Sequence, residues 1–344
     1  MLKYFIVLLC SMSLLTSRAQ EIYVDSNTGN DNNNGSKESP VLTIKKAAEI
    51  IKSPDNDIYI MKINPGMYVL DHYVSISTDK NISGKRIVIE STILPGDSLW
   101  TPEKMPIIIC TAKKGEIPLD YHFVASFLIE ASHVTFRGIK FPGYFYPNTR
   151  YFPIARLDKS KTDLFVEQCL FVGHEDASHL QVGIIAHGDS VRADHCIFYN
   201  VRNSIVFWQD SGNGIKTGNG ITNSIIYGAT QSGVWTAWPD KDFIFKNNIV
   251  ANCKNAWIKN GGNPTVYTID NCIFVNNKNY LVNATSSGFD TTGFKIIENG
   301  VVKEGTVNLV PKDAVTHLPL PTNYLHVDKE SLGYDMGAGL FKNE

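Results

Sequence analysis

The chain repeats a six-residue pattern, VEQCLF at 166–171, ADHCIF at 193–198, ITNSII at 221–226, FKNNIV at 245–250 and IDNCIF at 269–274. FRGIKF at 136–141 is a weaker sixth copy. The copies return every 24 to 30 residues, an interval too short for a propeller blade, and they lack the leucine framework of leucine-rich repeats. We therefore predict an all-β solenoid, a parallel β-helix of three-strand coils about 4.8 Å apart.

The centre of the pattern predicts a sharp bend between two strands. Asn223, Asn247 and Asn271 occupy the same position in successive copies, and Asn tolerates the left-handed backbone that such a bend needs. Stacked Asn side chains can also satisfy one another's amides. The next position holds small residues, which we expect to form an interior column: Cys169, Cys196, Ser224, Asn248 and Cys272. Five cysteines follow residue 20, and this odd number favours packing over a disulfide framework.

The two ends of the chain predict export and a single domain. Residues 1–20 have a signal peptide's charged start, apolar centre and small residues before the cleavage point, so we expect a secreted protein. Cys10 leaves a lipid anchor as an alternative. No later segment is apolar for long enough to span a bilayer, and the net charge of -2 does not favour nucleic acid. We expect a monomer with one domain over 21–344, comprising an N-terminal strand and capping helix (21–56), coils (57–292) and a C-terminal coil and cap (293–344).

Three motifs point to a known family. IYVDSNTGNDNNNG at 22–35, followed by Ser39-Pro40 and the amphipathic segment from Thr43 to Lys52, resembles the N-terminal signature of secreted right-handed β-helix proteins of the pectate-lyase-like superfamily. NPGMY at 64–68 and DMGA at 335–338 resemble two further landmarks of these proteins. The resemblance implies a right-handed helix capped by 43–52. It does not define a reaction, because the superfamily includes lyases, hydrolases, epimerases and non-catalytic adhesins.

A third strand follows each repeat and predicts an aromatic outer face. Alternation along these strands directs the side chains of Trp208, Trp235 and Trp257 outward if neighbours such as Val234 face inward. Indole rings stack on the apolar faces of sugars and keep an N–H for a hydroxyl. We therefore interpret the three tryptophans as substrate-binding residues. A loop that folds back over them is the structural alternative.

Acidic residues follow the same strands and suggest hydrolytic chemistry. Asp189, Asp210 and Asp240 form a column at one edge of the tryptophan face if the coils are in register. Adjacent or alternate coils would then separate two carboxylates by about 5 or 9.5 Å, spacings that bracket those of retaining and inverting glycosidases. A turn role for each aspartate is the alternative.

A lyase would use other residues on this face. Proton abstraction beside a uronate carboxylate needs a base, for which Lys259 is the first candidate, followed by His187, Arg202 and Lys216. The three aspartates could then hold calcium through their oxygens. Apart from this conditional calcium site, the sequence predicts no metal and no other cofactor.

The sequence thus predicts a secreted carbohydrate-active protein that cleaves glycosidic bonds of an extracellular polysaccharide. We favour hydrolysis through paired aspartates, with Lys259 and His187 as further catalytic candidates and with Lys216 and Arg202 as further substrate-binding candidates. A calcium-assisted lyase and a non-catalytic carbohydrate-binding β-helix are the alternatives.

Overall fold

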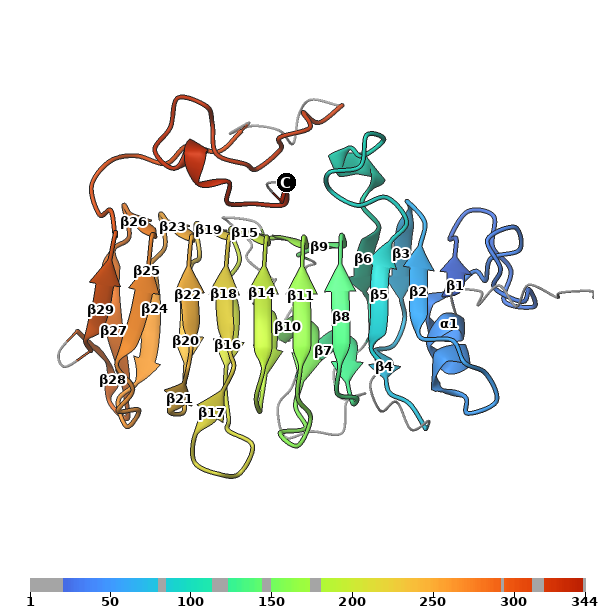
Figure 1. Cartoon of the computed structure of the whole chain (residues 1–344), viewed down its shortest axis with the longest axis horizontal. Coiled ribbons are helices and arrows are strands. Elements are labelled where there is room, and N and C mark those ends of the chain that lie inside the picture. Colours follow the sequence, from blue (N-terminus) through green and yellow to red (C-terminus); the bar gives the residue numbers. More distant parts are fainter. Residues whose placement is uncertain are drawn as a thin grey trace, which may run out of the picture.

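Three long sheets wind around one axis to form a parallel β-helix (Figure 1). The computed structural model describes residues 21–79, 85–112, 123–143, 150–173, 181–291, 294–310 and 319–342. Within these residues, successive coils pair strand to strand in parallel, as where Ile205 of one coil pairs with Val234 of the next. The predicted fold class is therefore confirmed.

Each regular coil contributes one short strand to each of the three sheets. The ten-stranded sheet contains β1 (Glu21–Val24), β2 (Ile60–Ile63), β5 (Ile87–Ser91), β8 (Val134–Arg137), β11 (Leu164–Glu167), β14 (Val191–Asp194), β18 (Gly220–Thr222), β22 (Ile244–Lys246), β25 (Tyr267–Asp270) and β29 (Ile296–Asn299). The eight-stranded sheet contains β3 (Met67–Leu70), β6 (Ile107–Cys110), β9 (Lys140–Pro142), β12 (Leu170–Val172), β15 (Ile197–Tyr199), β19 (Ile225–Tyr227), β23 (Ile249–Ala251) and β26 (Ile273–Val275).

The third sheet carries the candidate site described below. This nine-stranded sheet contains β4 (Val74–Ile76), β7 (Phe123–Ile129), β10 (Arg150–Arg156), β13 (Val182–Ala186), β16 (Asn203–Phe207), β20 (Ser232–Thr236), β24 (Asn255–Asn260), β27 (Asn279–Thr285) and the antiparallel β28 (Gly288–Asp290). The short pair β17 (Lys216–Thr217) and β21 (Asp240–Lys241) lies in the bend between this sheet and the ten-stranded sheet. Among the described residues, the 3-10 turns η1 (Pro102–Lys104) and η3 (Tyr334–Met336) lie outside the coils.

Stacked apolar side chains fill the interior of the coils. Phe171 lies between Phe141 and Phe198, with ring centroids 5.1 and 4.7 Å apart and the rings nearly parallel. Such stacking follows from the register, since pairing in parallel places like positions of neighbouring coils directly above one another.

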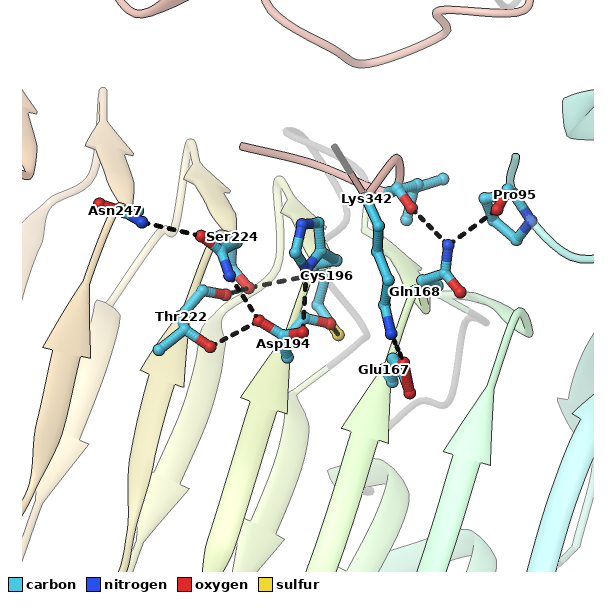
Figure 2. Close-up of polar contacts among 12 residues, drawn as sticks. Pro95, Glu167, Gln168, Asp194, Cys196, Thr222, Ser224, Asn247 and Lys342 are labelled. Carbon is cyan, nitrogen blue, oxygen red and sulfur yellow. Dashed lines mark hydrogen bonds and ion pairs between the residues drawn. The ribbon is translucent and has the colours of Figure 1, made fainter. Parts of the chain in front are cut away.

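The predicted Asn bend joins the ten-stranded and eight-stranded sheets. Asn223, Asn247 and Asn271 have φ angles of 49°, 55° and 48°, in the left-handed region. Their amides form a ladder, in which Asn271 donates to Asn247 (2.8 Å) and Asn247 to Asn223 (3.1 Å). Asn223 in turn donates to Asp194, which also accepts from Thr222, as Figure 2 shows. The ladder thus links four coils, as predicted.

The cysteines are interior packing residues, as the repeat predicted. All five described cysteines are buried and none forms a disulfide. Burial raises the pKa of the Cys169 and Cys253 thiols to about 12, so both remain protonated at neutral pH. Protonated, inaccessible thiols are inert.

Helix α1 (Ile44–Lys52) caps the first coil, as predicted. The Thr43 hydroxyl accepts a hydrogen bond from the Lys46 amide (3.1 Å), which fixes the start of the helix. Four apolar side chains of one face are buried against the coil: Ile44, Ala47, Ala48 and Ile51. In the described part of the chain, no helix has the length and apolarity needed to cross a bilayer. The predicted signal peptide (1–20), with Cys10, lies outside the described residues.

The chain beyond β29 returns along the side of the solenoid. Residues 319–342, which we call the C-terminal strap, lie over the outer face of the eight-stranded sheet (Figure 1). Leu325, Val327 and Leu340 pack there against a column of outward-facing side chains contributed by successive coils: Leu170, Ile197, Ile225, Ile249 and Ile273. Lys342 pairs with Glu167, and the Leu340 carbonyl accepts from Gln168 (2.8 Å; Figure 2).

His326 stabilises the C-terminal strap when its imidazole is neutral. Its Nε2 accepts the Leu340 amide (2.9 Å), its Nδ1 lies 3.1 Å from the Tyr324 carbonyl, and its ring stacks on Phe341. This arrangement requires a neutral ring with the proton on Nδ1. Burial lowers the pKa of His326 to about 4, in agreement with this geometry.

Replacing Asn247 tests the ladder. Asn247→Ala loses both amide contacts and forces an Ala into the left-handed region, so we expect unfolding to become easier by about 2 kcal/mol. Asn247→Gly keeps the backbone freedom and loses only the amide contacts, so its cost should be smaller. Urea unfolding of both variants measures the difference. Equal and negligible costs would show that the bend does not depend on Asn.

Replacing His326 tests the strap at acidic pH. Because its folded pKa lies below the unfolded value, its contribution to stability is complete above about pH 6.5 and is lost as the pH falls towards 4. The loss should reach about 3 kcal/mol. His326→Gln keeps an acceptor for Leu340 but does not titrate, so its free energy of unfolding should fall less between pH 7 and pH 4. Identical pH profiles would contradict this role.

Candidate functional site

An apolar pocket opens on the outer face of the nine-stranded sheet. It has a volume of about 210 Å³ and lies over β7, β10, β13, β16 and β20. Its apolar lining comes from outward-facing residues of these strands and their flanks: Phe123, Phe152, Leu157, Val182, Ile185, Val206, Trp208 and Trp235. Polar side chains stand around it: Arg150, Gln181, His187, Arg202, Asn203 and Gln231.

Two of the three predicted tryptophans line this pocket. Trp208 and Trp235 lie edge to face, with centroids 5.9 Å apart, and both are partly exposed. The Trp235 indole N–H donates to the Asn260 side chain (2.9 Å), which fixes the ring orientation. Within the described residues, the Trp208 indole N–H has no acceptor. The pair thus presents a fixed aromatic surface and one available donor.

The predicted outward position of Trp257 is wrong. Trp257 pairs with Val234, one residue out of the expected alignment, and its side chain is fully buried inside the coil. There it packs against Phe245 and Tyr267, and its indole N–H donates to the Thr236 hydroxyl (3.0 Å). A slip of one residue moves every side chain of a strand to the other face. Trp257 is therefore a core residue and cannot stack on a ligand in the pocket.

The same slip moves Lys259 away from the pocket. Lys259 pairs with inward-facing Thr236, and its side chain is buried with the ammonium 4.8 Å from the centre of the Phe294 ring. Burial lowers the pKa of Lys259. Its expected position on an outward face beside the tryptophans is therefore wrong.

His187 lines the pocket at the end of β13. Burial, together with the nearby charges of Arg156 and Lys216, lowers the pKa of His187 to about 4. The imidazole is therefore neutral at physiological pH and can accept or donate one hydrogen bond. Of the five residues predicted to be catalytic, this is the one that reaches the pocket.

Asp189 and Asp210 hold the bends that follow their strands. Asp189 accepts the Thr217 amide of the next coil (2.9 Å). Asp210 accepts the amides of Gly212 (2.8 Å) and Gly214 (2.5 Å) within its own loop. Burial opposes ionisation of Asp210, but these two amides outweigh it and hold its pKa below the usual range. Neither residue lines the pocket. Their contacts agree with the alternative that each aspartate stabilises a turn.

Lys216 and Asp240 form a buried ion pair below the sheet surface. The Lys216 ammonium lies 3.6 Å from Asp240, and both side chains are inaccessible to solvent. Burial raises the pKa of Asp240 to about 6 and lowers that of Lys216 to about 8. Asn219 donates to Asp240 (2.9 Å) and Lys216 donates to the Phe207 carbonyl (3.1 Å). Neither Lys216 nor Asp240 can reach a ligand in the pocket, which corrects their expected place on the outer face.

The structure offers no calcium site at the three aspartates. Among the described residues, no group of three or more His, Cys, Asp or Glu side chains is placed to hold a metal ion. Asp240 is already paired with a lysine, and one oxygen of each of Asp189 and Asp210 accepts backbone amides. The conditional calcium interpretation therefore has no geometric support in this part of the chain.

Several residues of the site escaped sequence analysis. Buried Arg156 donates to the carbonyls of His187 and Asp189 (2.8 Å each) and so fixes the segment that carries His187. Arg150, Gln181 and Gln231 stand beside the predicted Arg202 at the pocket. The signal for Gln181 and Gln231 was available, because each precedes the third strand of its repeat just as Arg202 does.

Removing one partner of the buried pair tests its structural role. Lys216→Met leaves the Asp240 carboxylate buried and unpaired, so we expect a loss of about 3–5 kcal/mol in the free energy of unfolding. Lys216→Met combined with Asp240→Asn removes both charges and keeps an acceptor for Asn219, so most of that loss should be recovered. Chemical denaturation at pH 7 measures both. A double variant no more stable than the single one would contradict the pairing.

Comparison with known proteins finds likeness only at the level of solved structures. No protein family and no curated protein matches the chain. A rhamnogalacturonan lyase aligns with 94% of this chain and 100% of its own at 14% identity and a TM-score of 0.46. A structure described as XylC with xylose aligns with 84% of this chain and 70% of its own, at 10% identity and a TM-score of 0.43. A GH136 lacto-N-biosidase from Eubacterium ramulus aligns with 84% of this chain and 68% of its own, at 10% identity and a TM-score of 0.37. At these scores no residue's role transfers to this chain.

Proposed function

We propose that this chain is an exported protein that binds a polysaccharide in the aromatic pocket of the nine-stranded sheet. One observation carries the proposal: Trp208 and Trp235 stay partly exposed on an otherwise apolar surface that side-chain amides surround. An exposed apolar patch with a polar margin marks a binding site. Export rests on the predicted signal peptide at residues 1–20.

The pocket suits a sugar because it combines flat apolar surface with hydrogen-bonding groups, both neutral side chains and the guanidinium groups of Arg150 and Arg202. An indole face packs against the C–H face of a sugar ring. The side-chain NH2 of Gln231 and the neutral ring of His187 can form hydrogen bonds with hydroxyl groups, whereas buried Asn203 is already bonded to Gln181, Gln231 and Ser232. Since Asn260 fixes the Trp235 ring before a ligand arrives, little side-chain entropy is lost on binding.

Binding is better supported than hydrolysis through paired aspartates. Asp189 and Asp210 are held by backbone amides and Asp240 is buried with Lys216, so no two of them face a bound sugar. The lyase alternative loses its first base candidate, because Lys259 lies beside Phe294 and away from the pocket lining, and it keeps His187 and Arg202, which line the pocket. His187 is the catalytic candidate that a ligand in the pocket would meet.

Alanine variants of the pocket tryptophans test binding. Trp235→Ala and Trp208→Ala should each weaken glycan binding by roughly tenfold or more, because each removes a stacking surface. Trp238→Ala is the matched control, since Trp238 is 44% exposed but does not line the pocket. Calorimetric titration against a glycan panel measures the affinities, and thermal unfolding verifies that each variant folds. Unchanged affinity in both pocket variants would overturn the proposal.

The same glycan panel separates binding from cleavage. New reducing ends with unsaturated, ultraviolet-absorbing products identify a lyase, and reducing ends without that absorbance identify a hydrolase. We expect neither product from the wild-type protein. Cleavage that His187→Gln abolishes without weakening binding would make the protein an enzyme and reject the binding-only assignment.

A further inference from the structure

The buried pair of Lys216 and Asp240 joins two adjacent coils in a fixed register. The short strands β17 and β21 pair in parallel with Lys216 aligned with Asp240, and the Lys216 amide donates to the Pro239 carbonyl (2.8 Å). Nζ of Lys216 lies 3.6 Å from Oδ2 of Asp240. Bound groups react from separations of about 3–3.5 Å, so the amine and the carboxyl group already stand close to a reactive arrangement.

The surroundings of this pair exclude water. Both side chains are inaccessible to solvent. The Lys216 nitrogen lies 6.0 Å from the centre of the Phe207 ring, which packs edge to face against Phe243 with centroids 5.0 Å apart. Oδ1 of Asp240 is buried and has no hydrogen-bond partner among the described residues. A buried carboxylate oxygen without a partner favours the neutral acid over the anion.

Burial also brings both groups towards their uncharged forms, which are the forms that can condense into an amide. The pKa of Asp240 is raised to about 6 and that of Lys216 is lowered to about 8. With two units between them, on the order of one pair in a hundred holds a neutral amine beside a neutral acid. Fewer than about one in a million would do so if both groups kept their ordinary pKa values.

Neighbouring groups fit both the attack on the carboxyl group and the resulting amide. Asn219 donates its side-chain N–H to Oδ2 of Asp240 (2.9 Å), and its own oxygen accepts the Val191 amide (2.7 Å), which fixes its orientation. A donor in this position stabilises negative charge that develops on Oδ2. The Phe207 carbonyl accepts from Nζ of Lys216 (3.1 Å) and can accept equally from the N–H of an amide there.

We propose that Lys216 and Asp240 condense after folding into an amide bond that links two neighbouring coils covalently. The lone pair of the neutral Lys216 amine attacks Cγ of the neutral Asp240 carboxyl group, and the new C–N bond forms as the bond from Cγ to Oδ1 breaks. One amine proton passes to the departing hydroxyl, so one water molecule is released and no electrons are exchanged. Oδ2 becomes the amide oxygen and stays bonded to Asn219.

The link anchors the loop that follows β16 to the next coil. This loop runs from Trp208 at the pocket to Lys216, so the bond fixes its far end. A covalent link also stabilises the fold by constraining the unfolded chain, as a disulfide does. The difference in stability between Lys216→Met and its double variant with Asp240→Asn is independent of the link, because neither variant can form it. The inference is separate from the proposed function, since a chain that binds no glycan can still carry the bond.

Mass spectrometry of the folded wild-type protein tests the link. We expect a mass lower than that of the purified sequence by one water molecule, and a digest with two peptides joined through Lys216 and Asp240. Lys216→Arg is the matched control, because it keeps the positive charge but has no amine to condense, and Asp240→Ala removes the carboxyl group. Both variants should keep their full mass.

The wild-type result is decisive even if a variant fails to fold. A full mass in the folded wild-type protein would overturn the proposal. A loss of water that persists in Lys216→Arg would overturn it as well, because the water would then come from another group.

The pH dependence of link formation tests whether the buried pair is the reactive group. Chains isolated unfolded in urea are refolded at pH 5, 7 and 9, and the linked fraction is followed by mass. Below about pH 6 Asp240 is neutral but Lys216 is an ammonium, and above about pH 8 Lys216 is neutral but Asp240 is a carboxylate. The rate should therefore be about tenfold lower at pH 5 and at pH 9 than at pH 7. A rate that rises steadily with pH, as for a solvent-exposed amine, would reject the buried pair.

Discussion

Parallel pairing of successive coils is the constraint on which every other feature depends. Because the coils stack about 4.8 Å apart in strict register, one residue type at one position becomes a column along the axis. The Asn ladder and the phenylalanine stack are two such columns, one in a bend and one in the interior. A site in this protein is therefore built from equivalent positions of neighbouring coils.

Register also explains which predictions succeeded and which failed. The Asn bend and the buried cysteines belong to repeats with conspicuous spacing, so the position of Asn247 or Cys272 could be predicted from sequence. The third strands lack such a marker, and a displacement of one residue placed Trp257 and Lys259 on the wrong face. Ala256, Trp257 and Ile258 are all apolar, so the sequence is compatible with either Ala256 or Trp257 facing inward. Packing of Trp257 in the aromatic core decides between the two.

The aspartates show a different limit of sequence analysis. The sequence places an acid after each of three strands, but it does not reveal what each carboxylate contacts. Asp210 turns back onto its own loop, and Asp240 finds a buried lysine from the preceding coil. Asn219 and Lys216 surround the Asp240 carboxylate. Both come from a loop whose path the repeat does not predict. Burial therefore raises the pKa of Asp240, whereas Asp189 stays half-buried, although both belong to the predicted column.

The three outer faces of the solenoid differ in a way that favours the nine-stranded sheet as the proposed binding face. On the ten-stranded sheet, charges of three successive coils are matched where Glu90 pairs with both Lys62 and Arg137. On the eight-stranded sheet, the C-terminal strap covers the apolar column, so that surface is already occupied by the chain itself. The nine-stranded sheet keeps an apolar face with two partly exposed tryptophans. Apolar surface that the strap covers is already removed from water, whereas the exposed rings of the nine-stranded sheet gain free energy when a ligand with a flat apolar face covers them.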